Sequence, residues 1–509
     1  MYPILIVGAG PTGLVLALWL TKLGVRVRII DKAAEPGTTS RALAVQARTL
    51  ELYRQVGLSD AVVEAGVEVA GINLWVRGAK AARAPVAAMG EGLSPFPFPL
   101  IYPQDAHERL LVDRLAALGV TVERRTELRG FDQDADVVRA VLGLPDGAEE
   151  VCVATYLAGC DGARSTVRGA LGTGFPGGTY SGLFYVADVV AGGEAADGEL
   201  HVELDAADFL AVFPLKGTGR LRLIGPTTGE GDRDRLDPSF DEIAERAREH
   251  LRLSITKVNW FSTYHVHHRV APAFREGRAF LLGDAAHVHS PVGGQGMNTG
   301  IGDAVNLAWK VAAVLKGNAG EELLATYELE RIDFARRLVA TTDRMFTLVT
   351  KPGVIARWIR TRVVPSIAPL AFRLGPVRRA LFRIVSQIGI RYPRSPLSVG
   401  VAGAVHGGDR LPWVETGPGT DNFAPLASLS WQLHVYGEAR PDVAEVCAEL
   451  GLPLHVFAWQ PHMQRRGIAR AALYLVRPDG YVALADAGGD PESVRDYFTS
   501  RLPSSSVRR

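Results

Sequence analysis

The chain has 509 residues, a net charge of +1 at pH 7 and an apolar fraction of 47%. Such a length is typical of roughly two to four domains, and a balance this close to neutral excludes a protein that binds nucleic acid through bulk charge. The three cysteines, Cys152, Cys160 and Cys447, form no CxxC pair, so we expect neither a metal site nor a disulfide framework. Without a signal peptide or an apolar run long enough to span a bilayer, a cytoplasmic location is expected.

The stretch "ILIVGAGPTGLVLALWLTKLGVRVRIID" predicts a strand, a glycine turn, a helix and a second strand. Gly8, Gly10 and Gly13 have the GxGxxG spacing, and Pro11 stands where the helix begins. These glycines allow a tight turn and close approach to a pyrophosphate, which the free N–H groups of the helix N-terminus bind. Asp31 ends the second strand, where an acid accepts a hydrogen bond from a ribose hydroxyl and disfavours a 2′-phosphate. The unit therefore predicts a site for FAD or NAD rather than NADP.

Further elements follow in chain order. Residues 41–60 are expected to be helical, and another helix is expected from about Asp105. Between about 178 and 270, short apolar runs such as "SGLFYVADVV" and "RLRLIGP" alternate with turns, which predicts an antiparallel sheet. Residues 302–392 are expected to be mostly helical. The mixture places the chain in the α/β class.

The segment 351–394 has an unusual charge pattern. It holds ten Arg or Lys residues and no Asp or Glu. The sequence favours a solvated or interface-facing basic surface, and a helix lying on a membrane surface is the alternative. Pro352, Pro365, Pro369 and Pro376 interrupt any long amphipathic helix here, which counts against the alternative.

A separate unit is expected from about residue 400. The runs "SWQLHVYG", "DVAEVCAELG" and "LHVFAW" predict strand, helix and strand, and "ARAALYLVRPDGYVALAD" predicts a hairpin with an Asp-Gly turn before a last helix. This order is thioredoxin-like. The position of the usual redox cysteines reads "GEARP", so no dithiol chemistry is expected.

Two more motifs present carboxylates at the ends of apolar strands. One is "LAGCDGARSTVRGALG", with Asp161 and Gly162, and the other is "AFLLGDAAHVHSPVGGQGMN", with Asp284. A single aspartate at such a position is usually a turn residue or a helix cap. The glycine-rich loop after Asp284 changes this interpretation, because it brings backbone N–H groups and a helix N-terminus toward one ligand edge.

Together, the three motifs resemble the single-component FAD-dependent aromatic hydroxylases, the group A flavoprotein monooxygenases of the para-hydroxybenzoate hydroxylase fold. The resemblance covers about residues 1–395, and the "LVRPDGYVA" segment and cysteine-free tail resemble the branch acting on phenols and polycyclic polyketides. It implies a Rossmann-type FAD-binding domain with an antiparallel substrate domain, a helical segment and a thioredoxin-like domain. The expected limits are 1–177 and 271–345 for the FAD-binding domain, 178–270 for the substrate sheet, 346–394 for the basic helices and 395–509 for the last domain.

The same resemblance assigns roles to residues. Asp31, which is Glu in most relatives, would bind the adenosine ribose; Arg41 would lie along the pyrophosphate with Arg48 supporting that region. Gln104 would reach the ribityl side chain, and Asp161 and Gly162 would serve the pyrophosphate and NAD(P)H entry. Asp284 would hold the ribityl chain or the pyrophosphate. The full expected cofactor set is Gly8, Gly10, Pro11, Gly13, Asp31, Lys32, Arg41, Arg48, Gln104, Asp161, Gly162, Asp284, Pro291, Gly296, Met297 and Asn298.

The catalytic edge of the flavin is expected beside Pro291, Gly294 and Gln295, with Gly296, Met297 and Asn298 contacting its pyrimidine ring through backbone groups. An apolar pocket for the substrate is expected between this edge and the antiparallel sheet. Each of its candidate residues could equally be plain core. The candidates are Trp75, Phe96, Phe98, Phe184, Tyr185, Phe209 and Phe213.

The implied reaction uses NADPH or NADH as co-substrate to reduce FAD. The reduced flavin then combines with O2 to give a C4a-hydroperoxide, which hydroxylates a small phenolic or polycyclic aromatic substrate. Two alternatives stay open: a Baeyer–Villiger or drug-inactivating monooxygenase, and a non-oxygenating FAD protein that binds a biosynthetic intermediate. Neither nucleic acid nor a membrane span is expected, and a homodimer is left open.

Overall fold

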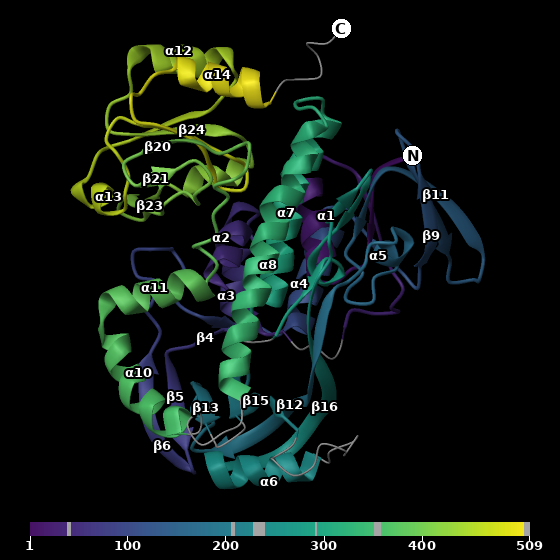
Figure 1. Cartoon of the computed structure of the whole chain (residues 1–509), viewed down its shortest axis with the longest axis vertical. Helices are drawn as coiled ribbons and strands as arrows, with labels where there is room; N and C mark the ends of the chain where they lie inside the picture. Colours follow the sequence, from purple (N-terminus) through teal and green to yellow (C-terminus); the bar gives the residue numbers. More distant parts are fainter. Residues whose placement is uncertain (38–41, 205–208, 228–239, 291–292, 351–357, 503–509) are drawn as a thin grey trace.

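The computed structural model describes residues 1–37, 42–204, 209–227, 240–290, 293–350 and 358–502. Figure 1 shows a C-terminal unit and a large antiparallel sheet at opposite ends of the molecule, with two long helices extending between them. Three sheets of six to eight strands organise the described chain, as the α/β assignment predicts.

The first sheet carries the glycine motif. Its main order is β17-β18-β11-β1-β2-β8, and β10 and β9 extend from β11. The strands from β18 through β11, β1 and β2 to β8 run parallel to one another, and β17 pairs with β18 antiparallel. The bounds are β1 Tyr2–Val7, β2 Val27–Asp31, β8 Val122–Arg124, β9 Glu127–Gln133, β10 Val138–Gly143, β11 Glu149–Gly159, β17 Arg275–Glu276 and β18 Ala279–Leu281.

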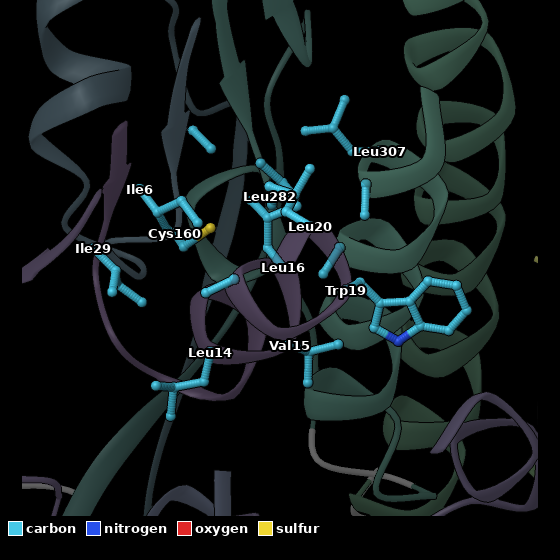
Figure 2. Packing of buried hydrophobic residues seen from close by; sticks show 14 of the residues in the cluster. Ile6, Leu14, Val15, Leu16, Trp19, Leu20, Ile29, Cys160, Leu282 and Leu307 are labelled. Carbon is cyan, nitrogen blue, oxygen red and sulfur yellow. The ribbon is translucent and has the colours of Figure 1, made fainter. Parts of the chain in front are cut away.

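Helices cover this sheet and complete its core. Leu16 and Leu20 of α1 pack near Leu282 and Leu307, all of them fully buried, and the cluster reaches Cys160 behind β1 (Figure 2). Burying a leucine side chain stabilises a fold by about 1.5–3 kcal/mol, so this apolar layer stabilises the packing of α1 and α7 against the sheet. The helices are α1 Pro11–Lys22, α4 Gln104–Ala116, α5 Thr166–Ala170, α7 Gly296–Leu315 and α8 Glu322–Thr350.

The second sheet confirms the antiparallel pattern expected after residue 178 and extends it. Its order is β19-β16-β12-β15-β14-β13-β5-β6, so strands from before and after the predicted range join it, and only β13 and β5 pair in parallel. Helix α6 (Phe240–Leu251) covers one face. The strands are β5 Gly71–Val76, β6 Ala79–Pro85, β12 Gly177–Gly193, β13 Leu200–Leu204, β14 Phe209–Pro214, β15 Arg220–Pro226, β16 Leu253–Val270 and β19 His287–Val288.

The helix expected over 41–60 is wrong in part. The segment forms β3 (Ala44–Val45), α2 (Ala47–Gln55) and the start of α3 (Ser59–Ala65). Strand β3 joins β7 (Leu100–Ile101) and β4 (Val67–Glu68) in a small sheet. Gly57 separates the helices because its φ of +73° lies in the left-handed region, which a continuous helix does not allow.

Two of the four prolines of the basic segment lie in the first turn of a helix, and one lies inside a helix. Pro365 lies in the first turn of α10 (Val364–Arg373) and Pro376 in the first turn of α11 (Gly375–Val385), where a missing N–H costs nothing. Pro369 lies inside α10, and Pro352 falls outside the described residues. A π-helical turn, Ile359–Val363, precedes α10. The result is two short amphipathic helices at an angle to each other.

From β24 onward, the C-terminal unit follows the predicted order of strand, helix, strand, hairpin and helix, with the additional short helix α13 before the hairpin; the strands β20 to β23 before it are not predicted. Its sheet order is β21-β20-β27-β26-β24-β25. Its likeness to thioredoxin stays a prediction. The bounds are β20 Val399–Ala402, β21 Val405–His406, β22 Glu415–Gly417, β23 Thr420–Asp421, β24 Gln432–Tyr436, α12 Pro441–Glu449, β25 Leu454–Phe457, α13 Pro461–Arg465, β26 Leu473–Val476, β27 Val482–Asp486 and α14 Glu492–Arg501.

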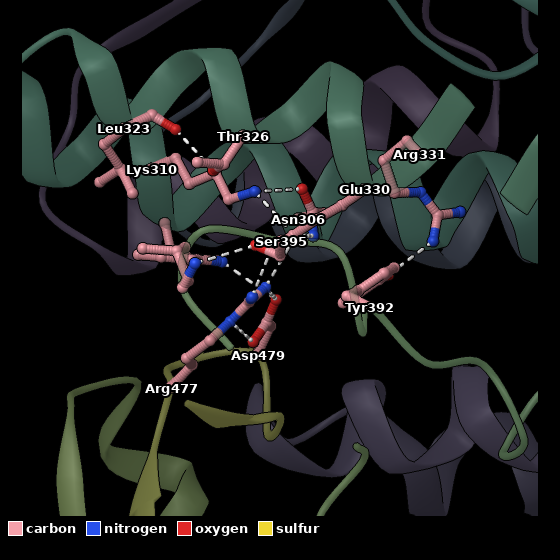
Figure 3. A network of polar contacts seen from close by, with 12 residues as sticks. Asn306, Lys310, Leu323, Thr326, Glu330, Arg331, Tyr392, Ser395, Arg477 and Asp479 are labelled. Carbon is pink, nitrogen blue, oxygen red and sulfur yellow. Dashed lines mark hydrogen bonds and ion pairs between the residues drawn. The ribbon is translucent and has the colours of Figure 1, made fainter. Parts of the chain in front are cut away.

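A buried ionic network joins this unit to α7 and α8 (Figure 3). Glu330 accepts hydrogen bonds from both terminal nitrogens of Arg477 at 2.7 and 3.0 Å and from Lys310 Nζ at 2.9 Å. Burial alone would raise the pKa of Glu330, but the charges of Arg477 and Lys310 hold it well below its ordinary value. Burial lowers the pKa of Lys310 to about 8. Removing any partner would leave a charge without compensation, so the network fixes how the two units meet.

Candidate functional site

The candidate site lies where the parallel strands of the first sheet end. The glycine turn follows β1, Asp31 ends β2, Asp161 comes after β11, and Asp284 comes after β18. Since the carboxyl ends of parallel strands meet at one edge, residues 253 positions apart in sequence, Asp31 and Asp284, lie along the same edge. Ligands of open α/β sheets bind at this edge.

The three glycines of the first turn have different surroundings. A Cβ on Gly8 would lie 2.4 Å from the carbonyl oxygen of Cys160, and one on Gly13 would lie 2.0 Å from that of Gly8. A Cβ on Gly10, in contrast, would meet nothing within 4 Å. Gly8 and Gly13 therefore serve close packing, whereas Gly10 leaves space beside the first turn of α1, which Pro11 opens.

Asp31 stabilises the turn from the neighbouring strand. Its Oδ2 accepts a hydrogen bond from the Ala9 amide at 2.7 Å, and its Oδ1 accepts one from the Ala33 amide at 2.7 Å. Arg124 Nη1 lies 3.8 Å from the same carboxylate. Lys32 is exposed next to it, and Arg41 falls outside the described residues. Sequence reasoning missed Arg124, whose position in β8 becomes relevant only when β8 pairs with β2.

Arg168 connects the second motif to the third. Its guanidinium donates hydrogen bonds to the carbonyl oxygens of Ala163 at 2.7 Å and Ala285 at 2.8 Å. Asp161 Oδ2 accepts from the Val167 amide at 3.1 Å, while its buried Oδ1 has no hydrogen-bond partner among the described residues. Gly162 has a φ of +79° and open space on its Cβ side. A buried carboxylate oxygen without a partner beside an open turn is a suitable place for a ligand hydroxyl.

The first motif also contacts the third. A Cβ on Gly283 would lie 2.6 Å from Thr12 Oγ1, and a Cβ on Gly300 would lie 2.3 Å from the same atom. Asp284 is exposed in the short turn that begins with Gly283. Because glycine alone permits both contacts, α1, this turn and α7 approach each other closely, and all three motifs meet at one place.

Behind this turn lies a buried ionic group that sequence reasoning missed. Asp303 Oδ2 accepts from the Gly283 amide at 3.0 Å and lies 2.7 Å from His287 Nε2, and its Oδ1 accepts from Arg331 at 2.6 Å. Burial would raise the pKa of Asp303, but Arg331 and His287 hold it below its ordinary value. His287 therefore positions the turn, and its neighbour His289 keeps a buried Nε2 that has no partner within the described chain.

The glycine-rich loop leads into the N-terminus of α7. Gly294 has a φ of +60°, and a Cβ there would lie 2.6 Å from that of Ala44. Gln295 is buried, and its Oε1 accepts from Gln387 at 2.9 Å. Gly296 and Met297 begin the helix and are half-buried. The expected catalytic Pro291 falls outside the described residues.

Asn298 holds this loop against β3 and α2. Its Nδ2 donates to the carbonyl oxygens of Ala44 at 2.9 Å and Gly294 at 2.8 Å. Its Oδ1 accepts from the Gln46 amide at 2.9 Å and from Thr49 Oγ1 at 2.8 Å. The side chain thus uses its full hydrogen-bonding capacity to position the loop. Sequence reasoning gave Asn298 a backbone role and missed Gln46 and Thr49, since nothing local links residues about 250 positions apart.

Gln104 is engaged with a residue that sequence reasoning also missed. Its Nε2 donates to Glu108 Oε1 at 2.7 Å, and Glu108 Oε2 accepts from the Gly37 amide at 3.1 Å. Burial raises the pKa of Glu108. The contact orders the side chain of Gln104 at the start of α4, and its reach to a ribityl chain stays a prediction.

The structure corrects the expectation for Arg48. Its guanidinium lies over the ring of Tyr481 at 5.0 Å and donates to Glu51 and to the backbone carbonyl of Asp479. Arg48 is therefore committed to the C-terminal unit rather than to a pyrophosphate. Its helical position gave no signal of a partner 431 residues later.

Two of the expected pocket residues lie on the face of the second sheet that α6 covers. Trp75 and Tyr185 are buried in a core with Ile243 and Ala247 of α6, and the Trp75 indole donates to His201 at 2.9 Å. Their assignment to the pocket is corrected for this reason. Successive residues of a strand point to opposite faces, so Phe184 points away from α6.

The opposite face of this sheet turns toward the first sheet. Phe184 lies 6.3 Å from Phe209 and 6.2 Å from Tyr264, ring centre to ring centre. On the same face, Arg222 donates to both oxygens of Asp188 at 2.5 and 2.9 Å and reaches the Ala42 carbonyl at 3.4 Å.

The remaining pocket candidates lie where the two sheets meet. Phe213 packs near Leu43 and Ile101, while Phe96 and Phe98 pack against the core of the first sheet. These three rings thus come from distant segments to one region, whereas Phe184 packs with side chains of its own sheet. Their contact with a substrate stays a prediction.

The described residues fit a dinucleotide that is bound at two separate places, the first turn of α1 and the start of α7. Gly10 leaves an open side at a helix N-terminus, Asp161 keeps a buried oxygen without a described partner, and Asn298 holds a second helix N-terminus farther along the chain. Helix N-termini favour negative charge, such as that of a pyrophosphate at one end and a reduced ring at the other.

Comparisons with known proteins agree with this geometry. Residues 1–342 match the FAD binding domain family. The chain is 35% identical to 6-methylpretetramide 4-monooxygenase of Streptomyces rimosus, over 94% of this chain and 90% of that protein. It is 32% identical to pentachlorophenol 4-monooxygenase of Sphingobium chlorophenolicum, over 87% and 81%. Among solved structures, the anhydrotetracycline hydroxylase of Streptomyces rimosus superposes with a TM-score of 0.79 at 28% identity, covering 99% of this chain and 100% of the other. The chain therefore belongs to the FAD-dependent aromatic monooxygenases that share this FAD-binding domain.

Proposed function

We propose that the protein uses FAD, NAD(P)H and O2 to hydroxylate a phenolic or polycyclic polyketide ring. In the balanced reaction, a ring C–H, NAD(P)H, a proton and O2 give a ring C–OH, NAD(P)+ and water. The convergence of three ligand-binding turns at one sheet edge, facing an aromatic-lined sheet, is the observation that carries the proposal. The polyketide and phenol substrates named for its relatives support the substrate class.

The described residues would hold the cofactor at both ends. Gly10 and the first turn of α1 would receive the pyrophosphate, Asp31 the ribose, and Asp161 and Asp284 the connecting chain. FAD supplies the redox chemistry, by accepting a hydride and activating O2. The chain's own contribution is to orient the ring system and to exclude water from it.

The start of α7 would stabilise negative charge on the reduced ring. The first N–H groups of a helix have no acceptor within the helix, so those of Gly296, Met297 and Asn298 are suited to an electron-rich edge. Gly294 allows the approach because a side chain there would collide with Ala44. Gln295 would act by shaping the loop, since its side chain is tied to Gln387.

The substrate would lie between this edge and the sheet face that carries Phe184, Phe209 and Tyr264. A flat apolar wall suits a ring system larger than one benzene. The residue limits of the domains, a cytoplasmic location and a homodimer stay part of the proposal; three buried free cysteines support a reducing compartment.

A turnover assay tests the function. The purified yellow protein is mixed with NADPH or NADH, with and without a panel of phenols and polyketide quinones, and the products are analysed by mass. Substrate-dependent oxidation of the nicotinamide with a product one oxygen heavier supports the proposal. A ketone converted to an ester would indicate a Baeyer–Villiger reaction instead. Oxidation without an oxygenated product, or a protein that binds no FAD, would refute it.

A further inference from the structure

Helices α10 and α11 expose an unusual number of large apolar side chains. The two helices lie along one outer edge of the molecule, beyond β5 and β6 and below the C-terminal unit in Figure 1. We call their outward side, with the preceding turn, the α10–α11 surface. Its apolar members and their exposed fractions are Trp358 60%, Ile359 41%, Ile367 56%, Leu370 62%, Leu374 54%, Val377 43% and Ile384 65%.

The pattern on each helix is amphipathic in a particular way. Ile367 and Leu370 have the i, i+3 spacing of one face of α10, and this face is turned to solvent rather than to the core; Leu374 follows directly after the helix and is also exposed. On α11, Val377 and Ile384 form an exposed row, and Arg379 and Arg383 lie about a third of a turn farther round the helix, on its side toward α13. An exposed apolar row bordered by cationic side chains is typical of an interaction surface rather than of a solvated helix.

An arginine-lined cavity adjoins this surface. It has a volume of about 510 Å³ and lies between α11 and α13. A second groove of about 700 Å³ shares Arg379, His462 and Arg466 with it. The residues lining the first cavity are Pro376, Arg379, Arg383, His462, Arg465 and Arg466.

No acid lines the first cavity, whereas Glu91 and Glu415 line the second groove. Among the described residues, none forms an ion pair or a side-chain hydrogen bond with the guanidinium groups of Arg379, Arg383, Arg465 and Arg466. Arg378 Nε is buried and also lacks a described partner. Burial and the neighbouring arginines lower the pKa of Arg383 and of Arg466. Such mutual repulsion is unfavourable until an anion binds.

The charge pattern distinguishes two possible partners of the α10–α11 surface, a second copy of the chain and an anionic bilayer. In a two-fold dimer through this surface, the same patch would face itself, and arginines would face arginines. Residues 351–394 contain no acid, and Glu91 and Glu415 line the second groove but not the first cavity. An anionic bilayer satisfies both features, since its phosphates pair with arginines while exposed apolar side chains enter the boundary between headgroups and acyl chains.

We propose that the α10–α11 surface docks the protein onto an anionic lipid bilayer, with lipid phosphates in the arginine-lined cavity. Docking is peripheral: among the helices that the structure describes, none combines the length and the apolar character needed to cross a membrane. The proposal goes beyond the oxygenation reaction and does not depend on it.

Vesicle co-sedimentation of the FAD-loaded full chain tests the docking. The protein is expected to sediment with vesicles containing about one-third phosphatidylglycerol and to stay in solution with pure phosphatidylcholine. Arg379→Gln combined with Arg383→Gln is expected to lower the partition coefficient roughly 30-fold, because each arginine near an anionic surface contributes about a factor of five. Ile367→Ser combined with Leu370→Ser is expected to lower it at least about tenfold.

Matched controls carry the same changes elsewhere. Leu329→Ser replaces a leucine that is 52% exposed on α8, and Arg139→Gln replaces an arginine whose side chain is 44% exposed on β10; both are expected to sediment like the parent. Equal binding to both vesicle types, no binding to either, or equal losses in the controls would overturn the proposal. So would a dimer in light scattering that Leu370→Ser dissociates. NAD(P)H oxidation by the surface variants is expected to stay unchanged, so a failed docking experiment leaves the proposed function standing.

Discussion

Replacing Asn298 by Ala tests whether the loop before α7 holds the flavin. The change removes four hydrogen bonds at once: two donated to the carbonyls of Ala44 and Gly294, and two accepted from Gln46 and Thr49. Each buried group left without a partner costs about 1–3 kcal/mol. At about 1 kcal/mol for each of the four, the ordered loop loses about 4 kcal/mol. Because every 1.4 kcal/mol is tenfold in an equilibrium constant, the Kd for FAD is expected to rise by about 10- to 1000-fold.

The assay is titration of the apoprotein with FAD, followed by flavin fluorescence. Asn422→Ala provides the control, since Asn422 is also fully buried and uses its amide on Val414, Pro412 and Tyr436 in the C-terminal unit. The control is expected to lower the free energy of unfolding and to leave the Kd for FAD within about twofold of the parent. If Asn298→Ala binds FAD as tightly as the control does, the loop does not hold the flavin and the reasoning fails.

Three further changes test the packing around the site. Glu330→Gln leaves the charge of Arg477 less compensated and is expected to destabilise the C-terminal unit by about 3–5 kcal/mol. In calorimetry, this unit should then unfold in a separate transition at lower temperature, and a single unshifted transition would contradict the prediction. Gly300→Ala, whose Cβ would lie 2.3 Å from Thr12 Oγ1, is expected to cost about 1–3 kcal/mol in urea unfolding, and Thr12→Ala should recover part of that loss. Burial lowers the pKa of His434 from 6.5 to about 3, so the unfolded chain takes up a proton that the folded chain does not as the pH falls below 6.5. His434 is therefore expected to contribute ~2 kcal/mol to the loss of stability between pH 6.5 and 5, and His434→Gln should remove that share while those of His107 and His289 stay.

Local patterns in the sequence predicted the elements that local physics controls. Glycine spacing and an apolar strand were enough to locate the turn at Gly8 and the acid at Asp31, because a tight turn between a strand and a helix has few solutions. The alternation of apolar runs and turns likewise predicted the second sheet. It did not reveal that β5 and β6 join that sheet from far earlier in the chain.

The predictions that the structure overturns depend on contacts between distant segments. The family resemblance predicts that Arg48 supports the pyrophosphate region, but its side chain binds the C-terminal unit. Trp75 and Tyr185 were assigned to a pocket because they are aromatic, and only the pairing of strands shows that they face α6. Likewise, the role of the Asn298 side chain becomes visible only when β3 lies beside α7.

The bond between Arg48 and Asp479 also has a consequence for how the chain is made. The two residues are 431 positions apart, and ribosomes add about 5–20 residues per second, so roughly 20–90 seconds separate their synthesis. During that interval, Arg48 has Glu51 of its own helix but neither the Asp479 carbonyl nor the Tyr481 ring. The anchoring of α2 to the C-terminal unit is therefore completed only when the last strands have left the ribosome. A chain released before Asp479 would keep every glycine motif and lack this one anchor of α2.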